Sequence, residues 1–171
     1  AGLCVLLVMA VAPLGSASAQ AQAQAPISST IAMIGAGNMG QALGNLWAAA
    51  GYHVIFATRH PEELDAVVAA AGHGAEAATV AEAIAQAGII TLAVPYSAEP
   101  AIARAHGKAM QGKVLVDVNN AFERRDGEVA KKAEAVGEAV YSAQLFAGTR
   151  FVRAFNLKGA NSFPAPDAVE A

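Results

Sequence analysis

The sequence is poor in the residues that mark several common classes of protein. Its 171 residues contain a single cysteine, which excludes a disulfide framework and any metal site built from several thiolates. Charged residues make up only 15% of the chain and the net charge is -3, so the chain lacks the basic surface that holds a nucleic acid. Hydrophobic residues make up 55%, with 16 glycines, which predicts a well-packed core with close contacts between its elements.

The N-terminal segment has an apolar run followed by small residues. Residues 3–11 read LCVLLVMAV, and residues 17–19 read Ala-Ser-Ala. About nine apolar residues are too few to span a hydrocarbon core roughly 30 Å thick, but they are typical of a secretory signal. We therefore expect a cleaved signal peptide over residues 1–19 and a flexible linker over 20–28. The mature protein would be periplasmic or secreted, without a membrane span; the alternative is an Ala/Gln-rich tail on a cytoplasmic protein.

Downstream of residue 28, short apolar runs alternate with alanine-rich segments of helical length. The strands that we expect lie at residues 29–34, 53–57, 89–94, 114–118 and 150–155. The expected helices lie at residues 38–50, 61–71, 79–87, 97–110 and 137–146, with a charged loop from 123 to 132. Strands separated by helices predict an α/β fold over residues 29–171, with a doubly wound, mostly parallel sheet covered on both faces.

A glycine-rich loop follows the first strand and opens the first helix. Its residues are Gly35, Ala36, Gly37, Asn38, Met39 and Gly40. They match G-x-G-x-x-G, in which the first glycine makes a tight turn, the second lets the backbone approach a pyrophosphate and the third lets the helix pack on the strand. Free amide groups at the start of the helix then hold the anion. The loop predicts a dinucleotide-binding Rossmann fold; the alternative is a tight structural turn.

The end of the second strand indicates which dinucleotide binds. NAD enzymes usually have an acidic residue there, which accepts hydrogen bonds from the ribose hydroxyls. This chain has Thr58, Arg59 and His60, and no acid before Glu62. A guanidinium can bind a 2′-phosphate with two parallel hydrogen bonds, so this segment favours NADP(H). A solvated loop arginine is the alternative.

Polar and aromatic residues follow three further strands. The predicted members of a nicotinamide pocket at these strand ends are Val94, Pro95, Tyr96, Asn120, Ala154 and Asn156. Carboxyl ends of parallel strands meet at one edge of a sheet, where ligands bind in such folds. Asp117 also lies at a strand end, and a structural role is as good an interpretation as a ligand-binding one: its carboxylate would accept hydrogen bonds from loop amides. We find no catalytic triad, no pair of carboxylates and no spacing typical of metal ligands.

The motifs resemble those of NADP oxidoreductases that use the deazaflavin coenzyme F-420. The matching stretches are IAMIGAGNMGQAL, YHVIFATR, ITLAVPYSA, GKVLVDVNN and RFVRAFN, which together span residues 30–156. The resemblance implies that the pyrophosphate lies on Gly37, Asn38 and Met39. It also implies that the 2′-phosphate lies on Thr58 and Arg59. The nicotinamide would lie near Val94, Pro95 and Ala154.

The resemblance implies an enzyme that transfers a hydride between NADPH and a flavin or F-420 acceptor. Such a transfer needs little acid–base chemistry from the protein, which agrees with the lack of a catalytic dyad. Two alternatives stay open: an NADP-binding module without turnover, and a reductase of a small imine or carbonyl compound that would need a further helical domain. The expected partner is a small-molecule electron acceptor, with no nucleic acid, and a homodimer is left open.

Overall fold

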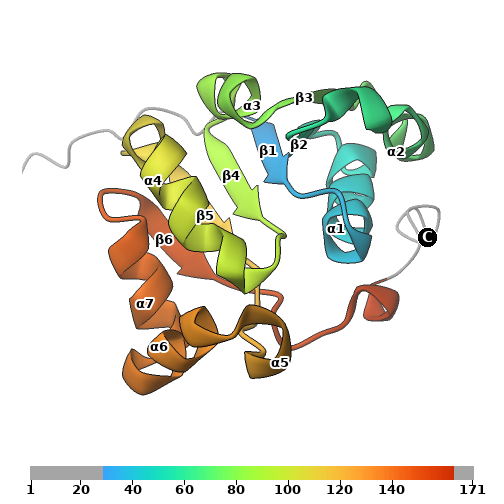
Figure 1. Cartoon of the computed structure of the whole chain (residues 1–171). Helices are drawn as coiled ribbons and strands as arrows, with labels where there is room; N and C mark the ends of the chain where they lie inside the picture. The colour runs from blue at the N-terminus through green and yellow to red at the C-terminus, as the bar shows by residue number, and fades with distance from the viewer. Residues whose placement is uncertain (1–28, 164–171) are drawn as a thin grey trace, which may run out of the picture.

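The computed structural model describes residues 29–163 and contains one six-stranded sheet. All its strands are parallel, in the order β3-β2-β1-β4-β5-β6 (Figure 1). The strands are β1 (Thr30–Ile34), β2 (His53–Thr58), β3 (Glu76–Thr79), β4 (Ile89–Leu92), β5 (Val114–Asp117) and β6 (Arg150–Arg153). The chain thus builds the sheet outward from β1 in one direction, then returns to β4 and builds in the other. This is the doubly wound fold expected from the sequence.

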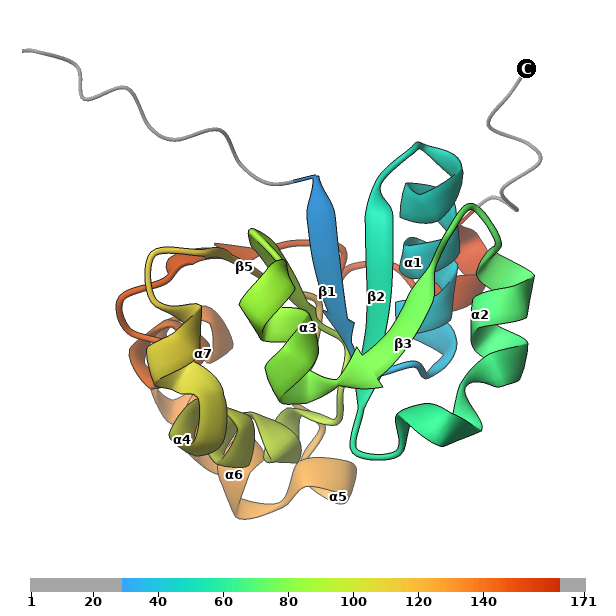
Figure 2. The same cartoon turned by 90° about the horizontal axis from the view of Figure 1, so that it is seen from above.

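Helices cover both faces of the sheet. The α-helices are α1 (Asn38–Ala49), α2 (Asp65–Ala71), α3 (Val80–Gln86), α4 (Glu99–Met110), α5 (Glu123–Asp126), α6 (Glu128–Val136) and α7 (Glu138–Leu145). Three short 3₁₀ helices are η1 (Pro61–Glu63), η2 (Tyr96–Ala98) and η3 (Ala160–Ser162). Helices α1 and α2 lie on one face, and α3, α4 and α7 lie on the other (Figure 2).

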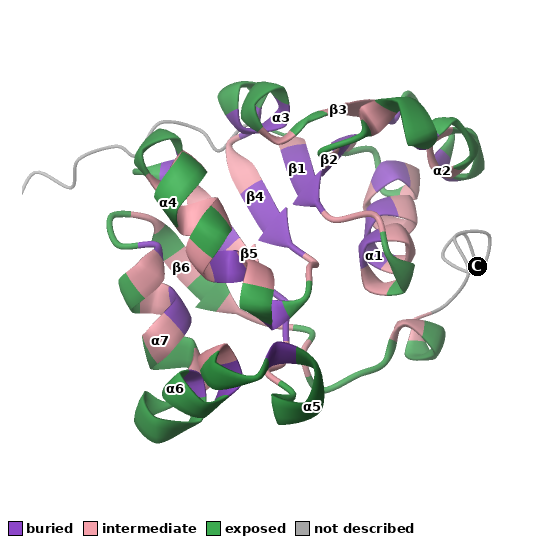
Figure 3. Cartoon of the chain, in the orientation of Figure 1, coloured by how far each residue is buried: buried purple, intermediate pink, exposed green. Residues whose placement is uncertain are grey.

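The core consists of two apolar layers, one on each face, because successive residues of a strand point to opposite sides. In β1, Ala32 and Ile34 pack under α3, whereas Met33 packs under α1. Apolar runs that do not alternate with polar residues are therefore buried at every position after the first, as β1 and β4 show in the centre of Figure 3. This burial fixes the strand ends, and with them the site.

Three regions differ from the elements expected from the sequence. The helix expected at residues 61–71 is divided at Leu64 into η1 and α2. Strand β3 was not predicted, because Glu76–Thr79 lies at the edge of the sheet and has no apolar run. The charged stretch 123–132, expected as a loop, is helical in α5 and in the first half of α6. Ala130 and Ala133 give α6 a buried face, and Lys131 pairs with Glu128 across one turn at 2.8 Å.

The predicted signal peptide and linker, residues 1–28, lie outside the described residues. Within residues 29–163, no helix is both long enough and apolar enough to cross a membrane.

Candidate functional site

The candidate site lies at the carboxyl edge of the sheet, between β1 and β4. These neighbouring strands are followed by connections that run in opposite directions along the sheet. In open α/β sheets, this reversal leaves a crevice outside the strand ends, where ligands bind. Two cavities occupy this edge, one of about 410 Å³ and one of about 380 Å³, and both are lined by Val94 and Pro95.

The glycine loop forms the β1 side of the crevice. Gly35 has a φ of +100°, which favours glycine, and a side chain on it would clash with the Ala93 carbonyl of β4's end. A side chain on Gly40 would clash with the Gly35 carbonyl. In contrast, a Cβ on Gly37 would meet nothing within 4 Å. Two of the glycines are therefore required by packing, and Gly37 faces open space.

The start of α1 presents free amides to the crevice. The first backbone hydrogen bond of α1 runs from the Gln41 amide to the Gly37 carbonyl, at 2.9 Å. The amides of Asn38 and Met39 come before it and have no acceptor among residues 29–163. The Gln41 side chain donates a hydrogen bond to the Ala36 carbonyl at 2.7 Å, which braces the loop. This end of α1 can accept an anion.

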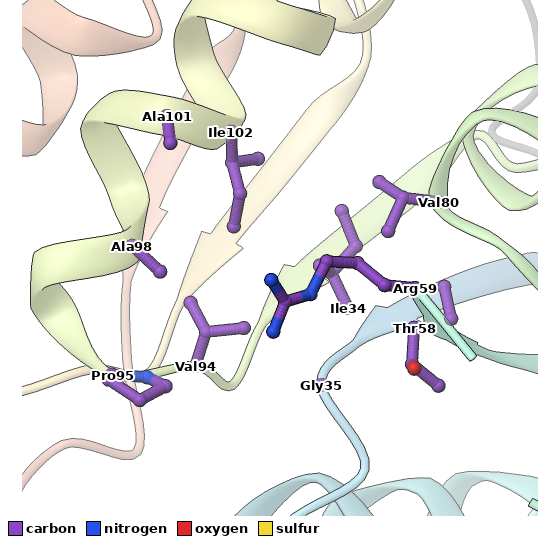
Figure 4. Close-up of a pocket in the computed structure, with 11 residues that line it drawn as sticks. Ile34, Gly35, Thr58, Arg59, Val80, Val94, Pro95, Ala98, Ala101 and Ile102 are labelled. Atoms are coloured by element: carbon purple, nitrogen blue, oxygen red, sulfur yellow. The ribbon is translucent and has the colours of Figure 1, made fainter. Parts of the chain in front are cut away.

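The larger cavity lies beside the end of β2. Its lining includes Thr58, Arg59, Val80 and Ile102, and no acidic residue. Figure 4 shows the Arg59 guanidinium extending from the end of β2 toward Val94. This cavity therefore offers a cation, a hydroxyl and apolar walls, a combination that suits a phosphorylated ribose and its base.

The smaller cavity lies on the other side of Val94 and Pro95. It extends from the start of α1 to the segment that follows β5 and to the chain beyond β6. Its lining residues are Gly37, Asn38, Met39, Ala93, Val94, Pro95, Val118, Asn119, Asn120, Phe122, Arg125, Lys158 and Gly159. Its ionisable side chains, Arg125 and Lys158, are both cationic.

Asn119 connects the wall of both cavities to a buried carboxyl group. Its Oδ1 accepts a hydrogen bond from the Val94 amide at 3.0 Å, and its Nδ2 donates one to Glu99 Oε1 at 2.8 Å. Its own amide donates to Asp117 Oδ1 at 2.9 Å. The predicted structural use of Asp117 is confirmed by this last contact. Asn119 thus fixes the backbone at the end of β4.

A chain of hydroxyl groups continues from Glu99 to α7. Glu99 Oε2 lies 2.7 Å from Ser142 Oγ, which lies 2.8 Å from the Tyr96 hydroxyl, which lies 2.9 Å from the Glu138 carbonyl oxygen. Ser142 donates to Glu99, and the Tyr96 hydroxyl donates to the Glu138 carbonyl. Burial, and next the Asp117 charge, raises the pKa of Glu99 to about 7, although the hydrogen bonds from Ser142 and Asn119 oppose this shift.

A buried ion pair lies next to this chain, at the ends of β5 and β6. Arg153 donates to Asp117 Oδ2 at 2.8 Å and also to Glu138. Burial raises the pKa of Asp117, although the Asn119 amide and Arg153 both oppose this shift. Asn120 joins the same region, because its Nδ2 donates to the Asn156 carbonyl at 2.7 Å. These contacts tie the three strand ends β4, β5 and β6 into one rigid wall.

The structure brings most of the predicted site residues to the two cavities. Those that line a cavity are Gly35, Gly37, Asn38, Met39, Thr58, Arg59, Val94, Pro95 and Asn120. Those that line neither are Ala36, Gly40, His60, Tyr96, Ala154 and Asn156. The cofactor-binding role of each remains a prediction.

The residues outside the cavities have visible structural roles. The Tyr96 side chain is fully buried and turned toward α7, and burial raises the pKa of its hydroxyl. His60 is exposed and faces Glu62, with Nδ1 and Oε1 3.2 Å apart. The Ala154 amide donates to the Asp117 carbonyl at 3.1 Å, which extends the pairing of β5 with β6.

Sequence reasoning missed part of the site. Asn119 lies in the DVNN motif, beside the predicted Asn120, so the motif pointed to the right segment but to the neighbouring residue. Phe122, Arg125 and Lys158 belong to segments without a motif, and Lys158 lies 33 positions beyond Arg125. No local pattern in the sequence brings them together.

Comparisons with known proteins agree with this geometry. The family described as NADP oxidoreductase, coenzyme F420-dependent, matches residues 30–121, more than half of the chain. Among solved structures, a hypothetical protein from Sinorhizobium meliloti is 31% identical, with a TM-score of 0.63, over 77% of this chain and 63% of its own. An imine reductase from Bacillus cereus is 28% identical, with a TM-score of 0.54, over 72% of this chain and 39% of its own.

A further structure shows the same fold. A protein from Arthrobacter sp. FB24, proposed to be an F420-dependent NADP reductase, is 21% identical with a TM-score of 0.62, over 77% of this chain and 64% of its own. The chain therefore spans less than two thirds of these solved relatives. From the family match over residues 30–121, the chain belongs to the family of coenzyme F420-dependent NADP oxidoreductases.

Proposed function

We propose that the chain binds NADP(H) and transfers a hydride between the nicotinamide and a flavin or deazaflavin acceptor. The observation that carries this proposal is the pairing of two features in one crevice. Free amides at Asn38 and Met39 can hold a diphosphate, and Arg59 stands, without any acidic neighbour in the cavity lining, where a 2′-phosphate would lie.

In this proposal, each of the two cavities binds one half of the dinucleotide. The larger one takes the adenosine half, with the 2′-phosphate on Thr58 and Arg59 and the base against Val80 and Ile102. The smaller one takes the nicotinamide half, against Val94 and the Asn119 side of the crevice. The diphosphate bridges them at Gly37, where the lack of a Cβ leaves room.

This reaction depends on the relative position of the two rings more than on acid–base groups of the protein. NADPH supplies two electrons and a hydrogen nucleus as hydride, the acceptor ring also takes a proton from solvent, and NADP⁺ and the reduced acceptor result. The protein holds both rings in place: the Val94 amide is fixed by Asn119 at 3.0 Å, so the wall behind the nicotinamide is rigid. Val118 and Pro95 give this cavity apolar surface beside the proposed nicotinamide position.

A second candidate function is the reduction of an imine, because the Bacillus cereus relative is an imine reductase. The reactive form of such a substrate is a cationic iminium ion. The smaller cavity offers it two cations, Arg125 and Lys158, and no carboxylate in its lining. Like charges repel, so this cavity favours a neutral or anionic acceptor over an iminium ion.

A single substitution tests the proposal. Gly37→Ala adds a Cβ that meets nothing within 4 Å, so the variant should fold and melt like the natural chain. The Cβ would lie where the diphosphate approaches the backbone, so NADPH affinity measured by isothermal titration should fall at least about tenfold. NADPH oxidation should be assayed with F420, FMN and a ferric chelate.

The results of these titrations and assays distinguish the proposed oxidoreductase from a binding module. Binding of NADPH without oxidation by any acceptor would favour a binding module without turnover. Unchanged NADPH affinity in Gly37→Ala, or a lack of NADPH binding by the natural chain, would refute the proposed site.

A further inference from the structure

The side chain of Asp126, at the end of α5, joins two segments that line the smaller cavity. Its Oδ1 accepts a hydrogen bond from the Ser97 amide at 3.1 Å, and its Oδ2 accepts one from the Phe122 amide at 2.9 Å. Ser97 lies in the connection from β4 to α4, shortly after Pro95, and Phe122 lies in the connection from β5 to α5. Pro95 and Phe122 both line the cavity in which we place the nicotinamide. We call these two hydrogen bonds the Asp126 bridge.

The same two connections are also joined closer to the strands. There the Val94 amide donates to Asn119 Oδ1 at 3.0 Å. Val94 directly precedes Pro95, so the two links lie on either side of Pro95 along the chain. A single link would allow the connections to pivot apart, whereas two links hold them at a fixed separation. The Asp126 bridge is the second link.

The Asp126 carboxylate is ionised and fixed in orientation. Its side chain is fully buried, and Arg125 contacts both oxygens, with Nε 3.0 Å from Oδ1 and Nη2 2.8 Å from Oδ2. Burial alone would raise the pKa of Asp126, but the hydrogen bonds from Arg125 and from the two amides lower it to about 2. A carboxylate has two acceptor oxygens and can therefore hold two amides at once. An asparagine side chain cannot, because its Nδ2 is itself a donor.

The stability of α5 does not explain an acidic residue at this position. Asp126 is the last residue of α5, where a negative charge meets the negative end of the helix dipole. Burial of a charge is also unfavourable unless partners surround it. The contacts that do surround Asp126 lead to the two connections beside the cavity, so its role is sought there.

We propose that Asp126 is a positioning residue of the nicotinamide site, and that its bridge sets the separation of the Pro95 and Phe122 segments before the dinucleotide binds. This inference rests on the proposed function, since it uses the nicotinamide half that we place in the smaller cavity. Asp126 lines neither cavity, so it acts through the two connections. A wall that is already ordered favours both the binding and the alignment of the nicotinamide ring.

The test compares NADP⁺ with 2′,5′-ADP, which has the adenosine and the 2′-phosphate but no nicotinamide. Both are titrated by isothermal calorimetry into the natural chain and into Asp126→Asn. We expect the variant to bind NADP⁺ at least about tenfold more weakly, as for a lost charge-assisted hydrogen bond, and to bind 2′,5′-ADP within about twofold of the natural chain. The proposed 2′-phosphate contacts, Thr58 and Arg59, lie at the end of β2 and do not depend on the bridge.

The comparison separates positioning from stability. A role in stability alone would reduce the folded fraction and weaken the apparent binding of both ligands by the same factor. Glu123→Gln is the matched control, because it removes an equal charge from α5. Glu123 is exposed, lines neither cavity and lies 3.6 Å from Lys131, so this variant should bind both ligands like the natural chain.

Amide hydrogen exchange of the natural chain tests the bridge without a substitution, and so does not depend on the folding of Asp126→Asn. In the absence of NADP⁺, the Ser97 and Phe122 amides should exchange at least about tenfold more slowly than the amide of Leu157, a residue that is 94% exposed. Protection before the dinucleotide is added is what a wall ordered in advance requires.

An equal loss of affinity for NADP⁺ and 2′,5′-ADP in Asp126→Asn, or no loss of either, would overturn the inference. So would Ser97 and Phe122 amides that exchange as fast as the Leu157 amide in the free protein. A natural chain that binds neither ligand would refute the proposed function instead, and the exchange measurement would still decide whether the Asp126 bridge is formed.

Discussion

The Val94 amide and the Asn119 side chain are joined by a hydrogen bond of 3.0 Å across 25 positions of the chain. Val94 lines both cavities, and Asn119 also donates to the buried Glu99 at 2.8 Å. The backbone that faces the proposed nicotinamide is therefore held by a side chain from the segment that follows β5. Rigid support of this kind is what a hydride transfer between two planar rings requires.

Asn119→Ala should weaken both the fold and the site. It leaves the Val94 amide and Glu99 Oε1 without their partner, and an unsatisfied buried polar group costs about 1–3 kcal/mol. We expect a lower free energy of unfolding by about that amount, and a roughly tenfold loss of NADPH affinity because the β4 end is no longer fixed. Chemical unfolding and isothermal titration measure the two effects.

Asn119→Asp is the matched control, because its carboxylate can still accept from the Val94 amide. It should retain more NADPH affinity than Asn119→Ala. If Asn119→Ala bound NADPH as tightly as the natural chain, the supporting role of this hydrogen bond would be disproved.

Glu99 should make the stability of the protein depend on pH. Its pKa rises from 4.5 to about 7 on folding, so both states are protonated below about pH 4.5. Between these two values only the unfolded chain ionises, and the free energy of unfolding should therefore fall as the pH rises, by at most about 3 kcal/mol. Urea unfolding at pH 5 and at pH 8 measures this loss.

Glu99→Gln removes the ionisable group and keeps both hydrogen-bonding positions. The free energy of unfolding of this variant, relative to the natural chain, should therefore increase from pH 5 to pH 8. Asp126 is present in both proteins, so its own titration largely cancels in the difference. Parallel pH profiles would show that Glu99 is ionised in the folded protein as in the unfolded chain.

Gly40→Ala should act on the fold, in contrast to Gly37→Ala. A Cβ on Gly40 would clash with the Gly35 carbonyl, so α1 would have to move away from β1. Overpacking of this kind costs about 1–3 kcal/mol or more, and should appear as a lower melting temperature. A Gly40→Ala variant with an unchanged melting temperature would contradict the close packing of α1 on β1.

The N-terminal prediction has a test of its own. The apolar run at residues 3–11 and the Ala-Ser-Ala site predict a mature protein that begins at Gln20 when the chain is produced in its natural host. Intact-mass analysis of the purified protein measures this start. A leader that remains attached to protein from the cytoplasmic fraction would contradict the export that we propose.

The sequence predicted the parts of the fold that depend on local patterns. The apolar runs of β1 and β4 and the glycine loop each occupy one continuous segment, so all three could be placed in the right order. The network at Glu99 could not be predicted, because its partners Asn119 and Ser142 lie 20 and 43 positions away. The contact of the Tyr96 hydroxyl with the Glu138 carbonyl could not be predicted either, because the two residues lie 42 positions apart; the cofactor-binding role of Tyr96 stays a prediction.

The charged stretch at residues 123–132 shows a second limit of prediction from local sequence patterns. Its charges indicated a solvated loop, whereas helix α6 uses them on its exposed face and buries Ala130 and Ala133. Small alanines give a weak apolar signal, so the helical period was hidden by the charges around it.

We propose that the crevice recognises the 2′-phosphate of NADP(H) through Arg59. Charge-assisted hydrogen bonds contribute roughly 1.5–3 kcal/mol, which corresponds to about a ten- to hundredfold preference for NADPH over NADH. Arg59→Ala should lose most of this preference by weakening NADPH binding alone, since NADH has no 2′-phosphate. Higher salt should also reduce the preference, because Arg59 lies at an exposed loop.

Isothermal titration of the natural chain and of Arg59→Ala with NADPH and NADH is the most direct test. We expect tighter binding of NADPH by the natural chain and nearly equal, NADH-like affinities in the variant. Equal affinities for the two dinucleotides in the natural chain, or an equal loss of both in Arg59→Ala, would contradict recognition of the 2′-phosphate by Arg59.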